Sequence, residues 1–404
     1  MNILVAQSGG PTAAINASLA GVIKAGLESD KIDQIYGGMN GIQGIIEDHI
    51  MLLNSIFEDE KNLAKLKITP AMYLGSCRYK LKTPNQDPSD FDAILAAFKK
   101  YEIGAFFYIG GNDSMDTVEK LADYTKEQNI DVKIVGVPKT VDNDLMQIDH
   151  TPGFGSAARY VATTVREIAM DTYIYNMDTV VIVEIMGRDA GWLTASSALA
   201  RFDGSVAPHL IYLPEVEFDM ESFLQAVKRK LFKYHHVIVA VSEGVKTADG
   251  EYLSSDHEKV DKFGHTALAG TGTMLQDLIK DRIGCKVRSV ELNVCQRAAG
   301  HCTSETDLSE SMQLGKNGVK YALDGMSGVM ASIFRTSDAP YSVEYGPADI
   351  HGIANAAKPV PREWISEDGT DVTDGMIQYL KPLVLGDPDV PYADGLPDYI
   401  IRNK

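Results

Sequence analysis

Short apolar runs alternate along this chain with segments of helical periodicity, and most of the runs end in glycine or polar residues. Runs of this length joined by helices predict parallel strands with crossover helices. The expected strands are 2–7, 105–110, 132–138, 179–187, 207–213 and 236–244. The expected helices end near Gly26 and Gln128 or cover about 156–175, 190–203 and 218–233. Ligands bind beyond the carboxyl ends of strands in open α/β sheets, so the turns that follow these runs are the candidate site.

The length of the chain predicts two α/β domains, and the lack of a low-complexity tract or Gly/Ser linker indicates that they pack closely with a cleft between them. It has 404 residues, 45% of them hydrophobic, which is enough to bury a large core. We place the first domain at about 1–150 and the second at 151–292. The chain is expected to return to the first domain over about 293–335, and residues 336–404 form a C-terminal extension.

Charge and cysteine usage restrict the partners and the compartment. The net charge is −18, which argues against nucleic acid or an anionic membrane surface, although a local cationic pocket could still bind a phosphorylated small molecule. No stretch approaches the roughly 20 apolar residues of a membrane span, and the N-terminus lacks the features of a signal peptide. Four cysteines without a CxxC pair suit a reducing cytoplasm. A metal cluster of Cys295, His301 and Cys302 is conceivable, but buried or incidental thiols are the simpler interpretation.

Two glycine pairs, in SGG (8–10) and GGNDS (110–114), lie where an expected strand meets a helix. Backbone N–H groups and the helix dipole make such turns suitable for phosphate, although glycine there often serves only backbone geometry. Asp113 is unexpected, because it puts a carboxylate where an anion would bind. The chain has no GxxxxGK[ST] motif, and GFGSAA (153–158) does not follow a strand, so neither common nucleotide fingerprint applies.

The segment PKTVDND (138–144) is the strongest candidate for chemistry. Asp142 and Asp144 alternate just after a buried strand, with Lys139 and Thr140 beside them. The simpler alternative is a polar turn, because Asx and Thr residues bond to their own backbone. A cation next to two carboxylates suits phosphoryl transfer, which needs positive charge on the moving group and a base for the acceptor hydroxyl.

Further charged residues lie on other turns. Arginine beside glycine at a strand end can bind phosphate with two hydrogen bonds, whereas an exposed ion pair is the alternative for each one. Glu243 could accept hydrogen bonds from sugar hydroxyls or could cap a helix. The cationic candidates are Arg78, Lys80, Arg188, Arg288 and Arg297.

Together these turns resemble the phosphofructokinase family from Asn2 to about Arg335. SGG, GS-x-R, GGNDS, PKTVDND, TPGFGSAAR, MGR, SEG and an arginine pair at 288 and 297 occur in that family's order. The resemblance implies an α/β fold of two Rossmann-like three-layer α/β/α domains with mostly parallel sheets and the active site in the cleft between them. The first domain would bind the phosphoryl donor and the second the sugar phosphate.

The resemblance also implies roles for individual residues. Asp142 would take the proton from the C1 hydroxyl of fructose 6-phosphate, with Mg²⁺ held at Asp113. The remaining catalytic residues would be Lys139, Thr140, Asp144 and Arg188. The donor would lie on Gly10, Arg78, Lys80, Gly111, Asn112, Asp113 and Ser114. The sugar phosphate would lie on Thr140, Asp142, Met186, Gly187, Arg188, Glu243, Arg288 and Arg297, with Arg288 reaching into a neighbouring subunit of a homodimer or homotetramer.

Two departures from the ATP-dependent members resemble the pyrophosphate-dependent branch. Those members have glycine where this chain has Asp113 and Lys139. A side chain at 113 fills space where a nucleotide would continue, and Lys139 adds a fixed cation beside the transferring phosphoryl group. Mg²⁺ between Asp113 and pyrophosphate would make the carboxylate favourable there. We therefore expect reversible transfer of phosphate from pyrophosphate to fructose 6-phosphate, as in glycolysis.

Other departures leave alternatives open. Asn112 replaces an aspartate that holds metal in ATP-dependent relatives, so metal binding by this loop stays open. Val294 and Thr179 replace residues that bind the sugar phosphate in relatives, so another sugar phosphate is an alternative acceptor. An ATP-dependent phosphofructokinase is the nearest alternative, and a nucleotide kinase with a similar glycine loop is a second. A non-catalytic two-domain sugar sensor is a third, but it does not explain Lys139, Asp142 and Asp144 on one turn.

Overall fold

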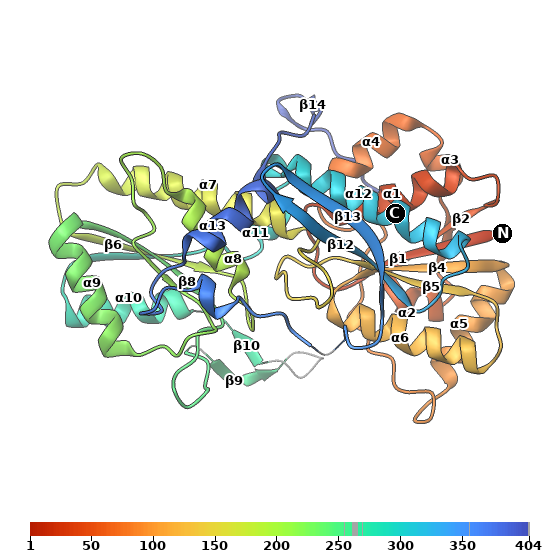
Figure 1. Ribbon diagram of the computed structural model, residues 1–404, viewed down its shortest axis with the longest axis horizontal. Coiled ribbons are helices and arrows are strands. Elements are labelled where there is room, and N and C mark those ends of the chain that lie inside the picture. Colours follow the sequence, from red (N-terminus) through yellow and green to blue (C-terminus); the bar gives the residue numbers. More distant parts are fainter. Residues whose placement is uncertain (254, 261–265, 269, 355, 403–404) are drawn as a thin grey trace.

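The computed structural model describes residues 1–253, 255–260, 266–268, 270–354 and 356–402, with backbone only for 255–260 and 266–268. The chain forms two halves, each with its own sheet (Figure 1). The larger sheet has seven strands in the order β13-β12-β5-β4-β1-β2-β3, and the smaller has four in the order β11-β6-β8-β7. The predicted α/β class with mostly parallel sheets is confirmed.

In the larger sheet, β1 pairs in parallel with β2 and β4, β5 pairs in parallel with β4 and β12, and β3 and β13 are antiparallel edges. Its strands are β1 (Asn2–Gln7), β2 (Ile35–Gly38), β3 (Ile50–Leu52), β4 (Ile103–Gly110), β5 (Lys133–Pro138), β12 (Val329–Asp338) and β13 (Tyr341–Asp349). The smaller sheet is fully parallel and consists of β6 (Thr179–Ile185), β7 (Leu210–Tyr212), β8 (His236–Ser242) and β11 (Lys286–Glu291). Two hairpins pair β9 (Ser255–Val260) with β10 (Thr266–Leu268) and β14 (Tyr392–Ala393) with β15 (Leu396–Pro397).

Helices cover both sheets. Those of the first half are α1 (Ile15–Leu27), α2 (Gly41–Ile46), α3 (Asn54–Phe57), α4 (Glu60–Ile68), α5 (Ser89–Lys100), α6 (Asn112–Glu127) and α12 (Glu305–Leu323). The others are α7 (Phe154–Tyr173), α8 (Trp192–Ala195), α9 (Met220–Tyr234), α10 (Thr271–Arg282), α11 (Cys295–Ala298) and α13 (Asp374–Leu380), with short 3₁₀ turns η1 (Ser196–Ala200), η2 (Gly300–Cys302), η3 (Arg362–Trp364) and η4 (Lys381–Val384). No helix in the described part of the chain is both long and apolar enough to span a bilayer.

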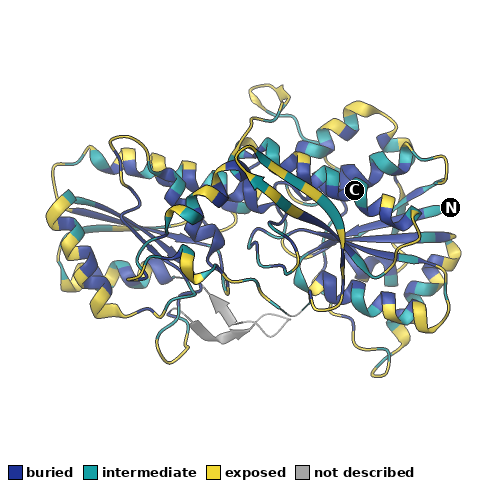
Figure 2. Ribbon diagram, viewed as in Figure 1, coloured by how far each residue is buried: buried dark blue, intermediate teal, exposed yellow. Residues whose placement is uncertain are grey.

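Burial explains why the apolar runs became strands. β1, β4, β5, β6 and β8 are almost wholly buried, as expected for central parallel strands with helices on both faces (Figure 2). The helix expected over 190–203 is shorter and is divided between α8 and η1, and the strand expected over 207–213 is reduced to β7.

The end of the chain belongs to both halves. β12 and β13 extend the larger sheet, whereas Met376, Tyr379 and Leu380 of α13 pack into the hydrophobic cluster on the smaller one. The predicted domain boundaries stay a prediction, but the described residues after 336 include β13 in the larger sheet and α13 against the smaller one.

Candidate active site between the two sheets

A cavity of about 600 Å³ opens where the carboxyl ends of strands from both sheets meet. Its walls contain nearly every predicted site residue: Gly10, Arg78, Lys80, Gly111, Asn112, Asp113, Ser114, Lys139, Thr140, Asp142, Asp144, Met186, Arg188, Glu243 and Arg297. The cavity is also lined by residues to which no individual role was assigned from the sequence: Ser8, Gly9, Pro11, Thr12, Cys77, Tyr79, Val141, Asp189, Ala190, Ala356 and Ala357. Most of these are neighbours of the motifs, but Ala356 and Ala357 come from the C-terminal part of the chain and carried no signal.

The loop after β4 shows why this glycine pair is at the site. A Cβ on Gly110 would approach Ser114 Oγ to 1.9 Å, so glycine permits the tight turn into α6. Helix α6 then begins at Asn112 with Asp113 in its first turn, where the helix dipole favours negative charge. Asp113 is exposed, and its carboxylate lies 3.8 Å from Lys80 Nζ.

Lys139 is a buried cation. Its side chain is 2% exposed, and its Nζ donates a hydrogen bond of 2.7 Å to the carbonyl of Gly10 on the first glycine loop. Burial lowers the pKa of Lys139 to about 8, and Asp142 opposes this shift. The loops after β1 and β5 are therefore joined through one ammonium group.

Asn143 fixes the turn that carries the two aspartates. It is fully buried and has φ +56°, a left-handed conformation that Asn tolerates. Its side-chain amide donates to Tyr379 Oη (2.9 Å), and its carbonyl oxygen accepts from Thr151 N (3.0 Å). This anchoring leaves Asp142 and Asp144 on either side of Asn143, both in the wall of the cavity.

Both aspartates are strongly affected by burial. Burial raises the pKa of Asp142 above its ordinary value, while Lys139 and Arg297 oppose the shift. Burial and then the charge of Asp142 raise the pKa of Asp144 to about 7. The Asp142 N–H donates to Thr140 Oγ1 over 3.1 Å, so Thr140 orients the backbone of the turn. A carboxylate surrounded by cations in a cleft suits proton abstraction from a hydroxyl.

The opposite wall comes from the ends of β6 and β8. Gly187 has φ +138°, and a Cβ there would approach the Ala190 carbonyl to 2.6 Å, so the turn requires glycine. Gly187 is buried and does not line the cavity, but its N–H donates to Glu243 Oε1 over 3.4 Å. Burial and then Asp142 raise the pKa of Glu243 to about 7. Gly187 thus positions Glu243.

Arg297 connects the two walls. Its Nε is buried and has no hydrogen-bond partner among the described residues, and a Cβ on Gly10 would lie 3.1 Å from its Nη1. The guanidinium therefore lies against the donor loop, with a donor atom available for an anion. Arg288 lies elsewhere: it does not line the cavity, its side chain is 48% exposed, and it is 3.7 Å from Asp171.

The described residues bring together one group with metal-ligand spacing outside the cavity, namely Glu119, Asp123 and His351. Among the described residues, Cys295, His301 and Cys302 do not form a group with metal-ligand spacing, so the metal cluster considered from the sequence is not found. All four cysteines are free thiols.

Comparison with known proteins identifies the family. The family model described as Phosphofructokinase matches residues 2–321. The pyrophosphate–fructose 6-phosphate 1-phosphotransferase of Methylococcus capsulatus is 40% identical over 402 residues, covering 99% of this chain and 95% of that protein. The enzyme of the same name from Xanthomonas campestris pv. campestris is also 40% identical, with the same coverage. A crystal structure of the pyrophosphate-dependent phosphofructokinase of Nitrosospira multiformis superimposes with a TM-score of 0.89 at 37% identity, covering 99% of this chain and 95% of that one.

Proposed function

Since the chain belongs to the phosphofructokinase family, we propose that it transfers a phosphoryl group reversibly from pyrophosphate to the C1 hydroxyl of fructose 6-phosphate. The proposal rests on one observation above all. Asp113 and Lys139, the two residues expected to select pyrophosphate, line the same cavity as the candidate base Asp142. The names of the relatives that cover almost the whole chain support the same donor and acceptor.

In this mechanism the C1 oxygen attacks the terminal phosphorus of pyrophosphate, the bridging P–O bond breaks, and inorganic phosphate leaves. Asp142 accepts the hydroxyl proton, and the reverse reaction returns it. Lys139 is held by Gly10 beside the donor loop, and Arg297 lies against that loop, so both can neutralise charge on the moving group. Glu243 would accept a hydrogen bond from the sugar. Positioning and charge neutralisation supply most of the rate in such reactions.

The residues present fit a magnesium ion. Asp113 is exposed and lines the cavity, and its carboxylate lies 3.8 Å from Lys80 Nζ, so its oxygens are accessible to a hard cation. Asp113 would hold Mg²⁺ together with the phosphate oxygens. The ion would neutralise pyrophosphate and draw electron density from the bridging oxygen. We further propose that the enzyme acts in the cytoplasm as a homo-oligomer.

The direct test is an initial-rate assay with fructose 6-phosphate, Mg²⁺ and either pyrophosphate or ATP. We expect turnover with pyrophosphate and none above background with ATP. Turnover with ATP alone would contradict the proposed donor while leaving the fold and base assignments in place. In the double variant Asp113→Gly/Lys139→Gly, the ratio of ATP-dependent to pyrophosphate-dependent turnover should rise, because the side chain that fills the nucleotide path and the cation beside the transferring group are both removed. Turnover with either donor should be below that of wild type with pyrophosphate, because Asp113 is also the proposed magnesium ligand. An unchanged preference would show that donor selection lies elsewhere.

A further inference from the structure

The part of the chain that follows β13 crosses from the larger sheet to the smaller one (Figure 1). We call residues 356–360 the crossing segment. Ala356 and Ala357 line the cavity, although they lie more than two hundred residues after the loops that carry the other site residues of the first half. The segment therefore forms part of the active-site wall.

One hydrogen bond ties the crossing segment to the start of α6, where the loop after β4 ends. The side-chain amide of Asn112 donates to the carbonyl of Ala356 over 2.7 Å. Asn112 immediately precedes Asp113 at the start of α6. The amide at this position, where ATP-dependent relatives have a carboxylate, is thus suited to holding a backbone carbonyl.

Lys358 ties the same segment to the loop that carries the base. Its backbone N–H donates to the carbonyl of Asp144 (2.7 Å), and its Nζ donates to the carbonyls of Ile148 (2.9 Å) and Asp149 (2.7 Å). These bonds hold both ends of the stretch 144–149. On the other side, Trp192 Nε1 donates to the carbonyl of Lys358 over 2.8 Å, which fixes the segment to the second half of the molecule.

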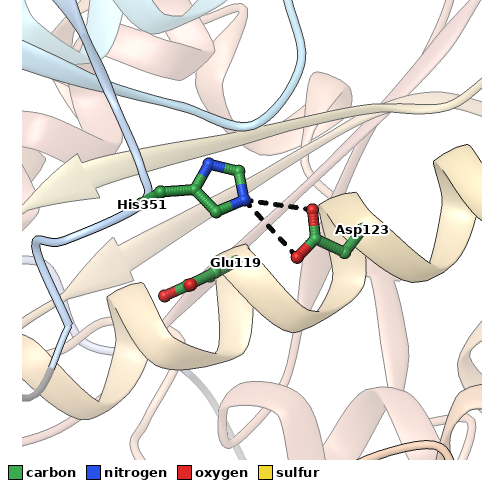
Figure 3. Close-up of side chains that lie close together, drawn as sticks. All are labelled: Glu119, Asp123 and His351. Carbon is green, nitrogen blue, oxygen red and sulfur yellow. Dashed lines mark hydrogen bonds and ion pairs between the residues drawn. The ribbon is translucent and has the colours of Figure 1, made fainter.

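The chain just before the crossing segment is anchored on α6. His351 Nε2 lies 3.2 Å from Asp123, and His351 Nδ1 lies 2.7 Å from Asp349, with Glu119 one helical turn before Asp123 (Figure 3). The three side chains could hold a metal ion by spacing, but both ring nitrogens of His351 already face carboxylates. We assign this group as an anchor of the chain on α6.

From these contacts we propose that Lys358 is a positioning residue for the catalytic loop. Through Lys358 and the Asn112–Ala356 hydrogen bond, the crossing segment fixes the start of α6 relative to the stretch 144–149, which follows the candidate base. The inference rests on the proposed function for its kinetic consequences, whereas the structural coupling stands without it.

The charges around Asp144 give this role a measurable signature. Asp144 faces Asp142 from its own loop, Asp189 from the turn after β6 and Lys358 from the crossing segment. Lys358 is itself affected by Asp149, Asp144 and Arg335, and burial lowers its pKa to about 8. It is therefore mostly cationic at pH 7 and opposes the upward pKa shift of Asp144. Removing its charge should raise the pKa of Asp144 further.

The test compares Lys358→Met with wild type and with Lys320→Met, a control at an exposed lysine of α12. We expect kcat of Lys358→Met to fall by about tenfold to a hundredfold with both KM values little changed. The acid limb of its kcat/KM profile should move up by about one pH unit. A purely structural role would lower Tm without moving that limb. Wild-type kcat and an unmoved limb in folded Lys358→Met would overturn the proposal.

Two further measurements decide the matter if Lys358→Met does not fold or if the proposed function fails. Trp192→Phe keeps an aromatic side chain but removes the indole N–H that bonds to Lys358 and shortens the ring that Lys358 Nζ overlies at 5.3 Å. Both contacts of Lys358 with the second half are therefore weakened, and kcat should fall by about threefold to fivefold; unchanged kcat would overturn the proposal. Amide hydrogen exchange over residues 140–149 needs no substrate and should be faster in Trp192→Phe and Lys358→Met than in wild type or Lys320→Met. Inactive wild type with accelerated exchange in the variants would refute the function but retain the coupling. Unaltered exchange would refute the coupling.

Discussion

The cavity has a donor wall, which carries Lys80, Asp113 and Lys139, and a sugar wall, which carries Glu243 and is joined to the donor wall by Arg297. The two walls hold their charged groups in different ways. The donor wall combines one buried cation, Lys139, with an exposed pair, in which the side chains of Lys80 and Asp113 are 49% and 46% exposed. On the sugar wall, Glu243 accepts from the N–H of Gly187, and the Nε of Arg297 is buried. A buried group keeps its position and acts strongly in a low dielectric, whereas exposed charges are screened and can rearrange around an ion. The sugar wall is therefore preorganised, while the donor wall is arranged to be completed by its ligand.

The turn that carries Asp142 and Asp144 lies between these walls and interacts electrostatically with groups on both. Lys139 and Arg297 both oppose the upward pKa shift that burial imposes on Asp142. Asp142 in turn raises the pKa of Glu243. The base is thus the group through which the two walls are electrostatically coupled.

Asp142→Ser is the largest expected perturbation. Turnover should fall by a factor on the order of a hundred or more, because a positioned general base contributes about 10²–10⁴-fold. Binding of fructose 6-phosphate should be retained, since the sugar wall remains intact. Steady-state kinetics and calorimetric titration of the sugar phosphate would check both points. Near wild-type turnover would contradict the base assignment.

Much of the fold and most of the site could be predicted from the sequence, because the decisive signals are local. The buried runs that became β1, β4, β5, β6 and β8 are followed by the turns that hold the site. Parallel strands bring their carboxyl ends together, so residues on separate turns could be expected to meet.

The remaining features depend on contacts between distant parts of the chain. The motif PKTVDND contains Asn143 but assigns it no role, because its partners are Thr151 and Tyr379, the latter more than two hundred residues later. Lys358 lies in no motif. Its three donated hydrogen bonds depend on the path of the chain after β13, which crosses from the larger sheet to the smaller one. Periodicity and turn chemistry carry no information about such pairings.

Glu243→Gln tests whether the Glu243 carboxylate on the sugar wall accepts a hydrogen bond from fructose 6-phosphate. Loss of a charged acceptor should raise KM for fructose 6-phosphate by about tenfold or more, with little change in KM for pyrophosphate. Burial raises the pKa of Glu243 to about 7, so its carboxylate form is lost as pH falls below that value. Wild-type KM for the sugar should therefore rise on acidification, and this rise should be absent in the variant.

The same variant separates Glu243 from Asp144, whose pKa is also raised to about 7. The acid limb of kcat should persist in Glu243→Gln, because Asp142 and Asp144 remain. Stability gives an independent check: a raised pKa means that the folded state binds the extra proton between about pH 4.5 and 7, so this group's contribution declines as pH rises through that window. In denaturant unfolding, the free energy of unfolding of Glu243→Gln should therefore fall less steeply with rising pH over this window than that of wild type. A KM that depends on pH as in wild type would contradict the assignment.

Arg288→Ala has the smallest expected effect and asks whether the sugar wall is complete within one chain. In the single chain Arg288 does not line the cavity, lies 3.7 Å from Asp171 and has its guanidinium over the Tyr175 ring. If it reaches the site of a neighbouring subunit, its loss should raise KM for fructose 6-phosphate by about threefold to fivefold, the size expected for one exposed ion pair. Arg282→Ala, which removes an exposed arginine paired with Glu221, is the matched control and should leave KM unchanged. An unaltered KM in Arg288→Ala, measured where sedimentation shows an oligomer, would mean that Arg297 and Arg188 bind the sugar phosphate without the neighbour and that each chain carries a complete sugar wall.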